Sequence, residues 1–325
     1  MRALLLKQLG SIDHLEWGEM PDKSPAAGQL LVRIKATSLN PADYKKALYN
    51  DPDRAYPIVL GLDAAGEIAA IGEGVTGFQL GDRVAALTSF GDNGAFAEYA
   101  VIDARAAALI PKELSYEQAA ALMCAGMTAY EAIVQRLNTD GKETILIHAG
   151  AGGVGGYAIQ LAKQKGLKVL TTASKLNHEW VKKLGADIVI DYNEEDVTER
   201  IRQETNGRGV DLILSTVNRD VATADLGRLA FAGQLAYIAG GPNMSDVKPF
   251  TLAPSVHEVA LVAAYDYDRA AIANLSILAS AIMQQAAEGR IDTLITETLE
   301  ASQLVDGLRK LAQRHVRGKI AVRMF

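Results

Sequence analysis

The middle of the chain alternates between short apolar runs and longer stretches in which apolar residues recur every three or four positions. The short runs predict strands at Thr144–His148, Lys168–Thr172, Ile188–Ile190, Val210–Ser215, Gln234–Ala239 and Val256–Ala263. The longer stretches predict helices at Tyr116–Leu137, Val154–Lys165, His178–Leu184, Val197–Thr205 and Val221–Ala230. Strands and helices in this order predict an α/β domain built on a doubly wound parallel sheet of six strands.

The two ends of the chain follow a different pattern. Up to about Pro111, Gly, Pro and Asp separate short apolar runs, which predicts a β-rich domain with strands at Leu30–Ala36, Gly61–Ile71, Gly81–Leu87 and Gly94–Ile102. A short helix is expected after Asn40, and the Pro and Asp residues of Asn50–Arg54 predict a loop. The tail predicts helices at Asp268–Ala287 and Ala301–Arg314 and a strand at Lys319–Phe325. Because these elements need a core to join, we expect residues 1–114 and 265–325 to form one domain and residues 115–264 the other.

A glycine-rich turn joins the first strand of the alternating region to its helix, in the spacing G-x-G-x-x-G. Gly150 permits the tight turn, Gly152 lets the backbone approach a pyrophosphate, and Gly155 lets the helix lie against the strand. The helix start then offers unpaired N–H groups and the positive end of the helix dipole to phosphate oxygens. With strand and helix on either side, this turn predicts a dinucleotide site.

The end of the second strand decides which dinucleotide is expected. An acid there would bind the ribose 2′-hydroxyl of NAD, but Thr171–Asn177 contains none. Ser174 can donate a hydrogen bond to a 2′-phosphate and Lys175 can neutralise it, which favours NADP(H). The alternative is that Lys175 is an ordinary solvated lysine at a helix start.

Composition bounds the function classes. The chain has 325 residues, a formal net charge of −6 and one cysteine, so a nucleic-acid partner, a disulfide framework and a four-cysteine metal site are not expected. We find neither a signal pattern nor an apolar run of membrane length, and we expect a cytoplasmic protein without a membrane partner.

Seven short motifs occur in the order of a known family: Ser38–Asp43, Gly61–Gly66, Gly81–Val84, Ala125–Tyr130, Ala149–Gly155, Leu184–Asp187 and Gly318–Ile320. Through them essentially the whole chain resembles the medium-chain dehydrogenase/reductase superfamily, and within it the zinc-independent, zeta-crystallin-like quinone and enone oxidoreductases. The resemblance implies a GroES-like β-rich catalytic domain together with a Rossmann domain.

The resemblance also locates the departures from the zinc-dependent branch. Asn40 stands where that branch carries its first cysteine, and Gly61-Leu62-Asp63 stands where it carries Gly-His-Glu. Cys124 falls at the third ligand position. One thiol without an imidazole cannot hold zinc, so no metal site is expected and Cys124 reads as a small buried residue.

Further site residues follow from the same resemblance. Asn40, Tyr44 and Lys45 are implied to face the nicotinamide and Thr128 to touch it, although the residues alone also allow an ordinary helix start and an ordinary helix threonine. Contacts with the cofactor are implied for the N–H groups of Gly153 and Val154, and for Tyr192, Ile238, Ala239, Gly240 and Lys319. Asn177 stands where several relatives carry a phosphate-binding lysine, which leaves that contact to Lys175.

Without a metal to polarise an alcohol, hydride transfer needs an acceptor that is already activated, such as a quinone or an α,β-unsaturated carbonyl. We therefore expect an NADPH-dependent reductase of such small molecules, with the cofactor carrying the hydride. The alternative is an NADPH-binding protein with a structural, sensing or RNA-binding role. A homodimer is expected through a last sheet strand at Val259–Ala264.

Overall fold

The computed structural model describes residues 1–48, 55–89 and 94–325, so the loop predicted at Asn50–Arg54 lies outside the described residues. The described chain divides into two compact units. One comprises Met1–Met127 and Leu261–Phe325, and the other comprises Thr128–Ala260.

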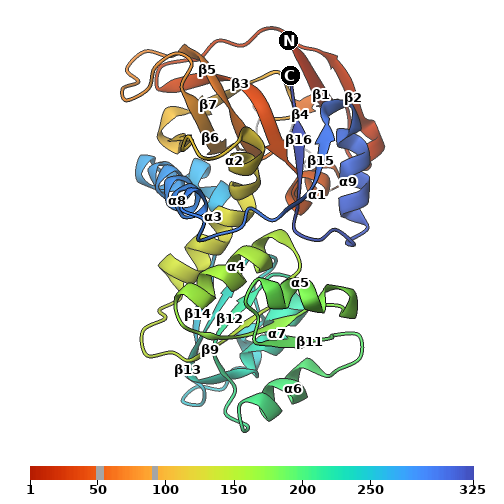
Figure 1. Ribbon diagram of the computed structural model, residues 1–325, viewed down its shortest axis with the longest axis vertical. Helices are drawn as coiled ribbons and strands as arrows, with labels where there is room; N and C mark the ends of the chain where they lie inside the picture. The colour runs from red at the N-terminus through yellow and green to blue at the C-terminus, as the bar shows by residue number, and fades with distance from the viewer. Residues whose placement is uncertain (49–54, 90–93) are drawn as a thin grey trace. The chain divides into compact units, whose positions relative to one another are not determined.

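The first unit is built on strands from both ends of the chain. Figure 1 shows the C-terminal strands, in blue, beside strands from the N-terminal part of the same unit. Over the described residues, one sheet has the order β15-β16-β3-β5-β6-β8, with β7 also paired to β3, and a second has the order β2-β1-β4. The strands are β1 (Arg2–Leu6), β2 (Leu15–Glu19), β3 (Gln29–Ser38), β4 (Ile58–Val59), β5 (Asp63–Ile71), β6 (Arg83–Leu87), β7 (Tyr99–Asp103), β8 (Ala108–Leu109), β15 (Ile295–Glu300) and β16 (Lys319–Arg323).

Apolar alternation along β3 sets the core of this sheet. Leu30, Val32 and Ile34 are buried at every second position, as a strand with one face on a core requires. The helices of the unit are α1 (Pro41–Leu48), α2 (Tyr116–Leu122), α8 (Arg269–Ala287) and α9 (Leu304–Ala312). Strand β15 was not predicted, although its alternating burial shows the period of two that marks a half-buried strand.

The helix predicted at Tyr116–Leu137 is broken. It consists of α2, of α3 (Cys124–Tyr130) and of a π-helical turn at Glu131–Arg136. The break follows Met123, because the backbone N–H of Cys124 donates to Asp63 Oδ1 at 2.8 Å. Helix α2, which we expected in the second domain, packs with its buried alanines against β3 and β5 of the first unit.

The second unit has the predicted doubly wound fold. Its sheet, within the described part of the chain, has six parallel strands in the order β11-β10-β9-β12-β13-β14. The strands are β9 (Thr144–Ile147), β10 (Lys168–Thr172), β11 (Ile188–Ile190), β12 (Val210–Ser215), β13 (Leu229–Tyr237) and β14 (Ser255–Glu258). The helices are α4 (Gly153–Gln164), α5 (His178–Lys183), α6 (Val197–Glu204) and α7 (Arg219–Leu226). Strand β12 is buried along its whole length, as expected for a central parallel strand covered on both faces.

The last strand of this sheet is present but ends earlier than predicted. Strand β14 ends at Glu258 because its partner β13 ends at Tyr237, and Leu261–Asp266 forms 3₁₀ turns. Residues Val259–Ala264 are therefore not an edge strand, and the homodimer that we expected through them loses its structural basis.

Helix α8 is, by length and composition alone, long and apolar enough to cross a membrane. Our prediction had found no span of membrane length. However, Leu275, Leu278, Ile282 and Met283 of α8 are buried within the first unit. A core helix of a globular domain passes the same test, so α8 is weak evidence for a membrane segment.

Candidate active site

The cofactor residues predicted in the second unit all follow the carboxyl ends of parallel strands. The glycine turn follows β9, Ser174 and Lys175 follow β10, Tyr192 follows β11, and Ile238–Gly240 follow β13. The strand order reverses between β9 and β12. Ligands of doubly wound sheets bind outside the strand carboxyl ends at such a reversal, so one edge of the sheet brings these loops together.

Two glycines of the turn have no room for a side chain. A Cβ on Gly150 would lie 2.1 Å from Thr171 Oγ1, and a Cβ on Gly155 would lie 2.4 Å from the carbonyl oxygen of Ala149. Gly152 is the N-cap residue of α4, and none of the described side chains caps this end of the helix. The helix start, with Gly153 and Val154, is therefore suited to an anion such as a pyrophosphate.

The loop after β10 carries the residues predicted to select the cofactor. Lys175 is exposed, Ser174 is half-buried, and Ser174 Oγ accepts a hydrogen bond from Asn177 Nδ2 at 3.1 Å. Sequence reasoning missed Asp191, whose Oδ2 accepts the backbone N–H of Lys175 at 2.9 Å and so fixes the turn. Hydrogen bonds, first from the backbone N–H of Asn193, lower the pKa of Asp191. Tyr192 beside it is 56% exposed.

The loop after β13 is held to the strand before it. Ile238 donates its N–H to the carbonyl of Ser215 at 3.2 Å, and Ala239 follows half-buried. Gly240 has φ +120°, and a Cβ there would lie 3.1 Å from the backbone nitrogen of Arg219. Residues with a Cβ rarely adopt this conformation, so the turn requires glycine.

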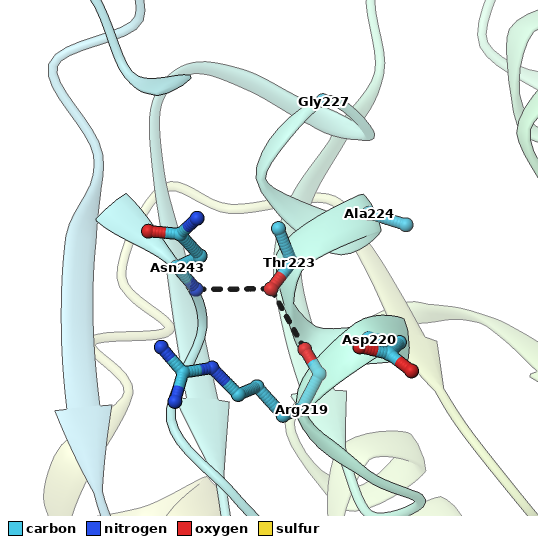
Figure 2. A pocket seen from close by; sticks show the side chains of 6 residues that line it. All are labelled: Arg219, Asp220, Thr223, Ala224, Gly227 and Asn243. Atoms are coloured by element: carbon cyan, nitrogen blue, oxygen red, sulfur yellow. Dashed lines mark hydrogen bonds between the residues drawn. The ribbon is translucent and has the colours of Figure 1, made fainter. Parts of the chain in front are cut away.

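An open hollow of about 570 Å³ lies along one side of α7 and contains none of the predicted site residues. It is lined by Arg219, Asp220, Thr223, Ala224, Gly227 and Asn243. Figure 2 shows Thr223 between Asn243 and Arg219, with a hydrogen bond to each. The Thr223 hydroxyl accepts the N–H of Asn243 at 2.9 Å and donates to the carbonyl of Arg219 at 2.8 Å.

The first unit contains a buried polar cluster around the carboxylate of Asp63. Asp63 is 0% exposed, and its Oδ2 accepts hydrogen bonds from Ser38 Oγ and from Asn40 Nδ2, the latter at 2.7 Å. Its Oδ1 accepts the N–H of Cys124. The Lys319 ammonium lies 3.5 Å from Oδ2, so a buried positive charge faces the buried negative one.

Lys319 and Asn40, both predicted site residues, are bound to each other in this cluster. Lys319 is 3% exposed and donates from Nζ to Asn40 Oδ1 at 2.6 Å and to the carbonyl of Leu39 at 3.1 Å. A lysine is rarely this deeply buried unless its charge is paired. The cofactor contact predicted for Lys319 stays a prediction, and it would require the ammonium to exchange one of these partners.

The cluster continues into the start of α1. Asp43 accepts the N–H of Asn40 at 2.8 Å and the N–H of Leu62 at 3.1 Å, which ties the helix start to the loop before β5. Burial, and then the charge of Asp63, raises the pKa of Asp43 to about 7. The sequence analysis did not identify Ser38 and Asp43 as members of the site. Asp43 could have been found, because an acid three residues after Asn40 has the spacing at which a side chain accepts an N–H at a helix start.

The remaining predicted residues lie on helices. Tyr44 and Lys45 follow in α1, where Tyr44 is buried in the core of the first unit and Lys45 is half-buried. Thr128 is buried in α3 and is the first residue of the second unit. Cys124 is half-buried rather than fully buried as predicted, and desolvation, and then the charge of Asp63, raises the pKa of its thiol.

Comparison with known proteins identifies the family of the chain. Residues 26–112 match the family of alcohol dehydrogenase GroES-like domains, and residues 153–280 match the family of zinc-binding dehydrogenases. A chloroplast envelope quinone oxidoreductase homolog of Arabidopsis thaliana is 32% identical over 324 residues, covering 96% of this chain and 95% of the relative. A trans-enoyl reductase of Aspergillus terreus is 34% identical over 252 residues, covering 71% and 83%.

Among solved structures, the quinone oxidoreductase of Escherichia coli complexed with NADPH superimposes with a TM-score of 0.85. It is 27% identical, and the match covers 99% of this chain and 100% of that one. The sequence motifs, the two folded units and these relatives agree. The chain belongs to the medium-chain dehydrogenase/reductase superfamily of oxidoreductases and, within it, to the quinone oxidoreductase branch.

Proposed function

We propose that this protein is an NADPH-dependent reductase of quinones or α,β-unsaturated carbonyl compounds that works without zinc. The observation that carries the proposal is the buried ion pair of Asp63 and Lys319, with Asn40 between them. The quinone oxidoreductase and trans-enoyl reductase relatives support the acceptor class, since the names of both denote reduction of conjugated acceptors.

NADPH fits the residues at the carboxyl edge of the second unit. The uncapped start of α4 offers N–H groups to a pyrophosphate. Because Gly150 and Gly155 have no Cβ, the turn can pack closely against Thr171 and Ala149. No acid occupies Ala173–Asn177, where a ribose 2′-hydroxyl would be bound, while Ser174 and Lys175 can bind a 2′-phosphate.

Zinc does not fit the residues around Asp63. Both carboxylate oxygens already accept hydrogen bonds, and the Lys319 ammonium at 3.5 Å would repel a second cation. Asn40 and Leu62 offer no thiolate or imidazole. Over the stretches that the structure describes, no group of three or more His, Cys, Asp or Glu side chains could hold a metal ion.

When bound, the reduced nicotinamide supplies the hydride. The protein then has to hold the acceptor and stabilise the charge that arrives on its oxygen, which conjugation already spreads over several atoms. On helix α1, whose start the Asp63 cluster fixes, the half-buried Lys45 would stabilise an enolate or quinol anion. Tyr44 packs in the core of the first unit, so the predicted role as proton donor would require its hydroxyl to reach the acceptor from that core.

The test is to follow the loss of nicotinamide absorbance when protein and NADPH are mixed with a panel of quinones and enones, with simple aldehydes and ketones as the comparison. We expect oxidation of NADPH with members of the panel and little with unconjugated carbonyls. Addition of a chelator should leave the rate unchanged, and metal analysis should find less than stoichiometric zinc. Binding of NADPH without oxidation across the panel would instead support a sensing or structural protein, and efficient oxidation of simple alcohols would refute the proposal.

A further inference from the structure

A buried chain of polar side chains lies directly behind the glycine turn. His148 is the first residue after β9, is 3% exposed, and brings Nε2 within 2.8 Å of Asp225 Oδ1. Asp225, on α7, is 0% exposed and also accepts a hydrogen bond from Arg228 Nη1 at 2.7 Å. Burial alone would raise the pKa of Asp225, but the hydrogen bonds from His148 and Arg228 hold it below its usual range. Both hydrogen bonds reach Oδ1, so this oxygen of a charged carboxylate is the acceptor for the imidazole.

The other nitrogen of the ring faces the end of the neighbouring strand. His148 Nδ1 lies 3.3 Å from Thr172 Oγ1, at the last residue of β10. Because a carboxylate can only accept, Nε2 carries the proton toward Asp225, and Nδ1 is left to pair with the Thr172 hydroxyl. The carboxylate thus fixes which way the ring faces.

Thr172 links the imidazole to the glycine turn by a hydrogen bond. Its hydroxyl oxygen accepts the backbone N–H of Ala149 at 3.0 Å. Ala149 has φ +51°, in the left-handed region that a residue with a Cβ adopts at a cost of about 1 kcal/mol or more. Its carbonyl in turn accepts the N–H of Gly152 at 3.0 Å and lies where a Cβ of Gly155 would be. The left-handed conformation of Ala149 therefore determines the backbone path of the glycine loop from β9 into α4.

We propose that His148 and Asp225 are positioning residues for dinucleotide binding, an inference that rests on the proposed function. Through Thr172 they hold Ala149 in its left-handed conformation, and so they aim the N–H groups at the start of α4 toward the pyrophosphate. Neither side chain needs to touch the cofactor. The loop is thereby arranged before the cofactor arrives, and binding does not have to supply the ordering free energy.

The experiment measures the dissociation constant of NADPH by fluorescence titration, together with kcat at saturating NADPH for an acceptor that the wild type reduces. His148→Phe removes both ring hydrogen bonds while keeping a flat ring, and Thr172→Val removes the hydroxyl with almost no change of shape. We expect each to weaken NADPH binding by about tenfold, roughly the effect of one lost hydrogen bond to a positioned group, and to change kcat by less than about threefold.

A matched control separates positioning from stability. Leu146 is a fully buried core residue of β9, two positions before His148, and makes no polar contact with the loop. Leu146→Ala should lower the urea midpoint of unfolding at least as much as His148→Phe does, yet leave the NADPH dissociation constant within about twofold of the wild type.

The double variant His148→Phe/Thr172→Val tests whether the residues act as one chain. If His148 acts through Thr172, the double variant binds NADPH about as weakly as Thr172→Val alone. Fold-changes that multiply, or a His148→Phe variant that binds NADPH like the wild type, would overturn the inference. If His148→Phe does not fold, the Thr172→Val variant decides alone: unchanged NADPH binding by Thr172→Val would overturn the inference. A wild type that binds no NADPH would instead refute the proposed function, and this inference with it.

Discussion

Replacing Lys319 by methionine tests the buried ion pair most directly. Methionine keeps much of the length and volume of the lysine stem, so little cavity is created. The change removes the ammonium beside Asp63 and with it the two hydrogen bonds that Nζ donates, to Asn40 Oδ1 at 2.6 Å and to the carbonyl of Leu39 at 3.1 Å. Asp63 keeps its hydrogen bonds from Ser38, Asn40 and Cys124 but becomes an uncompensated buried charge.

Removal of one partner from a buried ion pair costs about 3–5 kcal/mol of the free energy of unfolding, and we expect Lys319→Met to fall in that range. The matched control is Lys310→Met in the same unit. The Lys310 ammonium lies 2.6 Å from Glu297 Oε2, but both side chains are partly exposed, and the loss should be below about 1 kcal/mol. Urea unfolding at neutral pH, followed by fluorescence, gives both values.

A double-mutant cycle with Asp63→Asn then isolates the pair. Each single variant leaves one buried group unmatched, whereas the double variant removes both charges together. We expect the two single losses to exceed the loss of the double variant by about 2 kcal/mol or more. If Lys319→Met costs no more than Lys310→Met, or if the cycle shows a coupling below about 0.5 kcal/mol, the ammonium is not held by Asp63 and would not keep a metal ion from this position.

Three further predictions follow from the same contacts. Lys175→Ala should raise the KM for NADPH about tenfold or more and leave the KM for NADH almost unchanged, and equal turnover of the parent protein with both cofactors would refute a role in 2′-phosphate binding. Gly155→Ala should weaken NADPH binding by more than tenfold, because the new Cβ would lie 2.4 Å from the Ala149 carbonyl; titration of NADPH fluorescence measures this, and unchanged affinity would contradict it. The pKa of Asp43 is raised from 3.8 to about 7, so its contribution to stability is complete below pH 3.8 and is lost as the pH rises through about 7. The free energy of unfolding of the wild type should therefore fall relative to Asp43→Asn between pH 5 and pH 8, and a constant difference would show that Asp43 does not titrate there.

The second unit could be predicted well because its signals are local. The apolar runs of β9, β10, β11 and β12 are short and bounded by turns, and a parallel sheet buries such runs on both faces. Predictions failed where a distant contact overrides local propensity. The stretch Tyr116–Leu137 reads as one helix, but Asp63 takes the N–H of Cys124 and breaks it. Residues Val259–Ala264 read as a strand, but β13 ends too early to pair with them.

The glycine turn could likewise be recognised from sequence, since Gly150, Gly152 and Gly155 each answer a requirement that arises within a few residues. What holds the turn could not be recognised. The sequence placed His148 only at the end of a predicted strand, because its partner Asp225 is 77 residues away and the fold alone brings the two side chains together. A lone buried histidine acquires a role only when the groups at both ring nitrogens are known.

The two units use buried charge in parallel ways. In the first unit Asp63 is matched by Lys319, which is 256 residues later, and in the second Asp225 is matched by His148 and Arg228. Both carboxylates are linked to segments that carry predicted site residues. Asp63 accepts a hydrogen bond from Asn40, directly before α1 with Tyr44 and Lys45, and Asp225 is linked through His148 and Thr172 to the glycine turn that leads into α4. A buried, paired carboxylate is costly to move, because any shift would expose an unmatched charge to a low dielectric. Such clusters contribute less to net stability than an apolar core of equal volume would, but they fix the direction of the groups in front of them. Orientation is what hydride transfer to a conjugated acceptor requires when the chemistry is supplied by the cofactor.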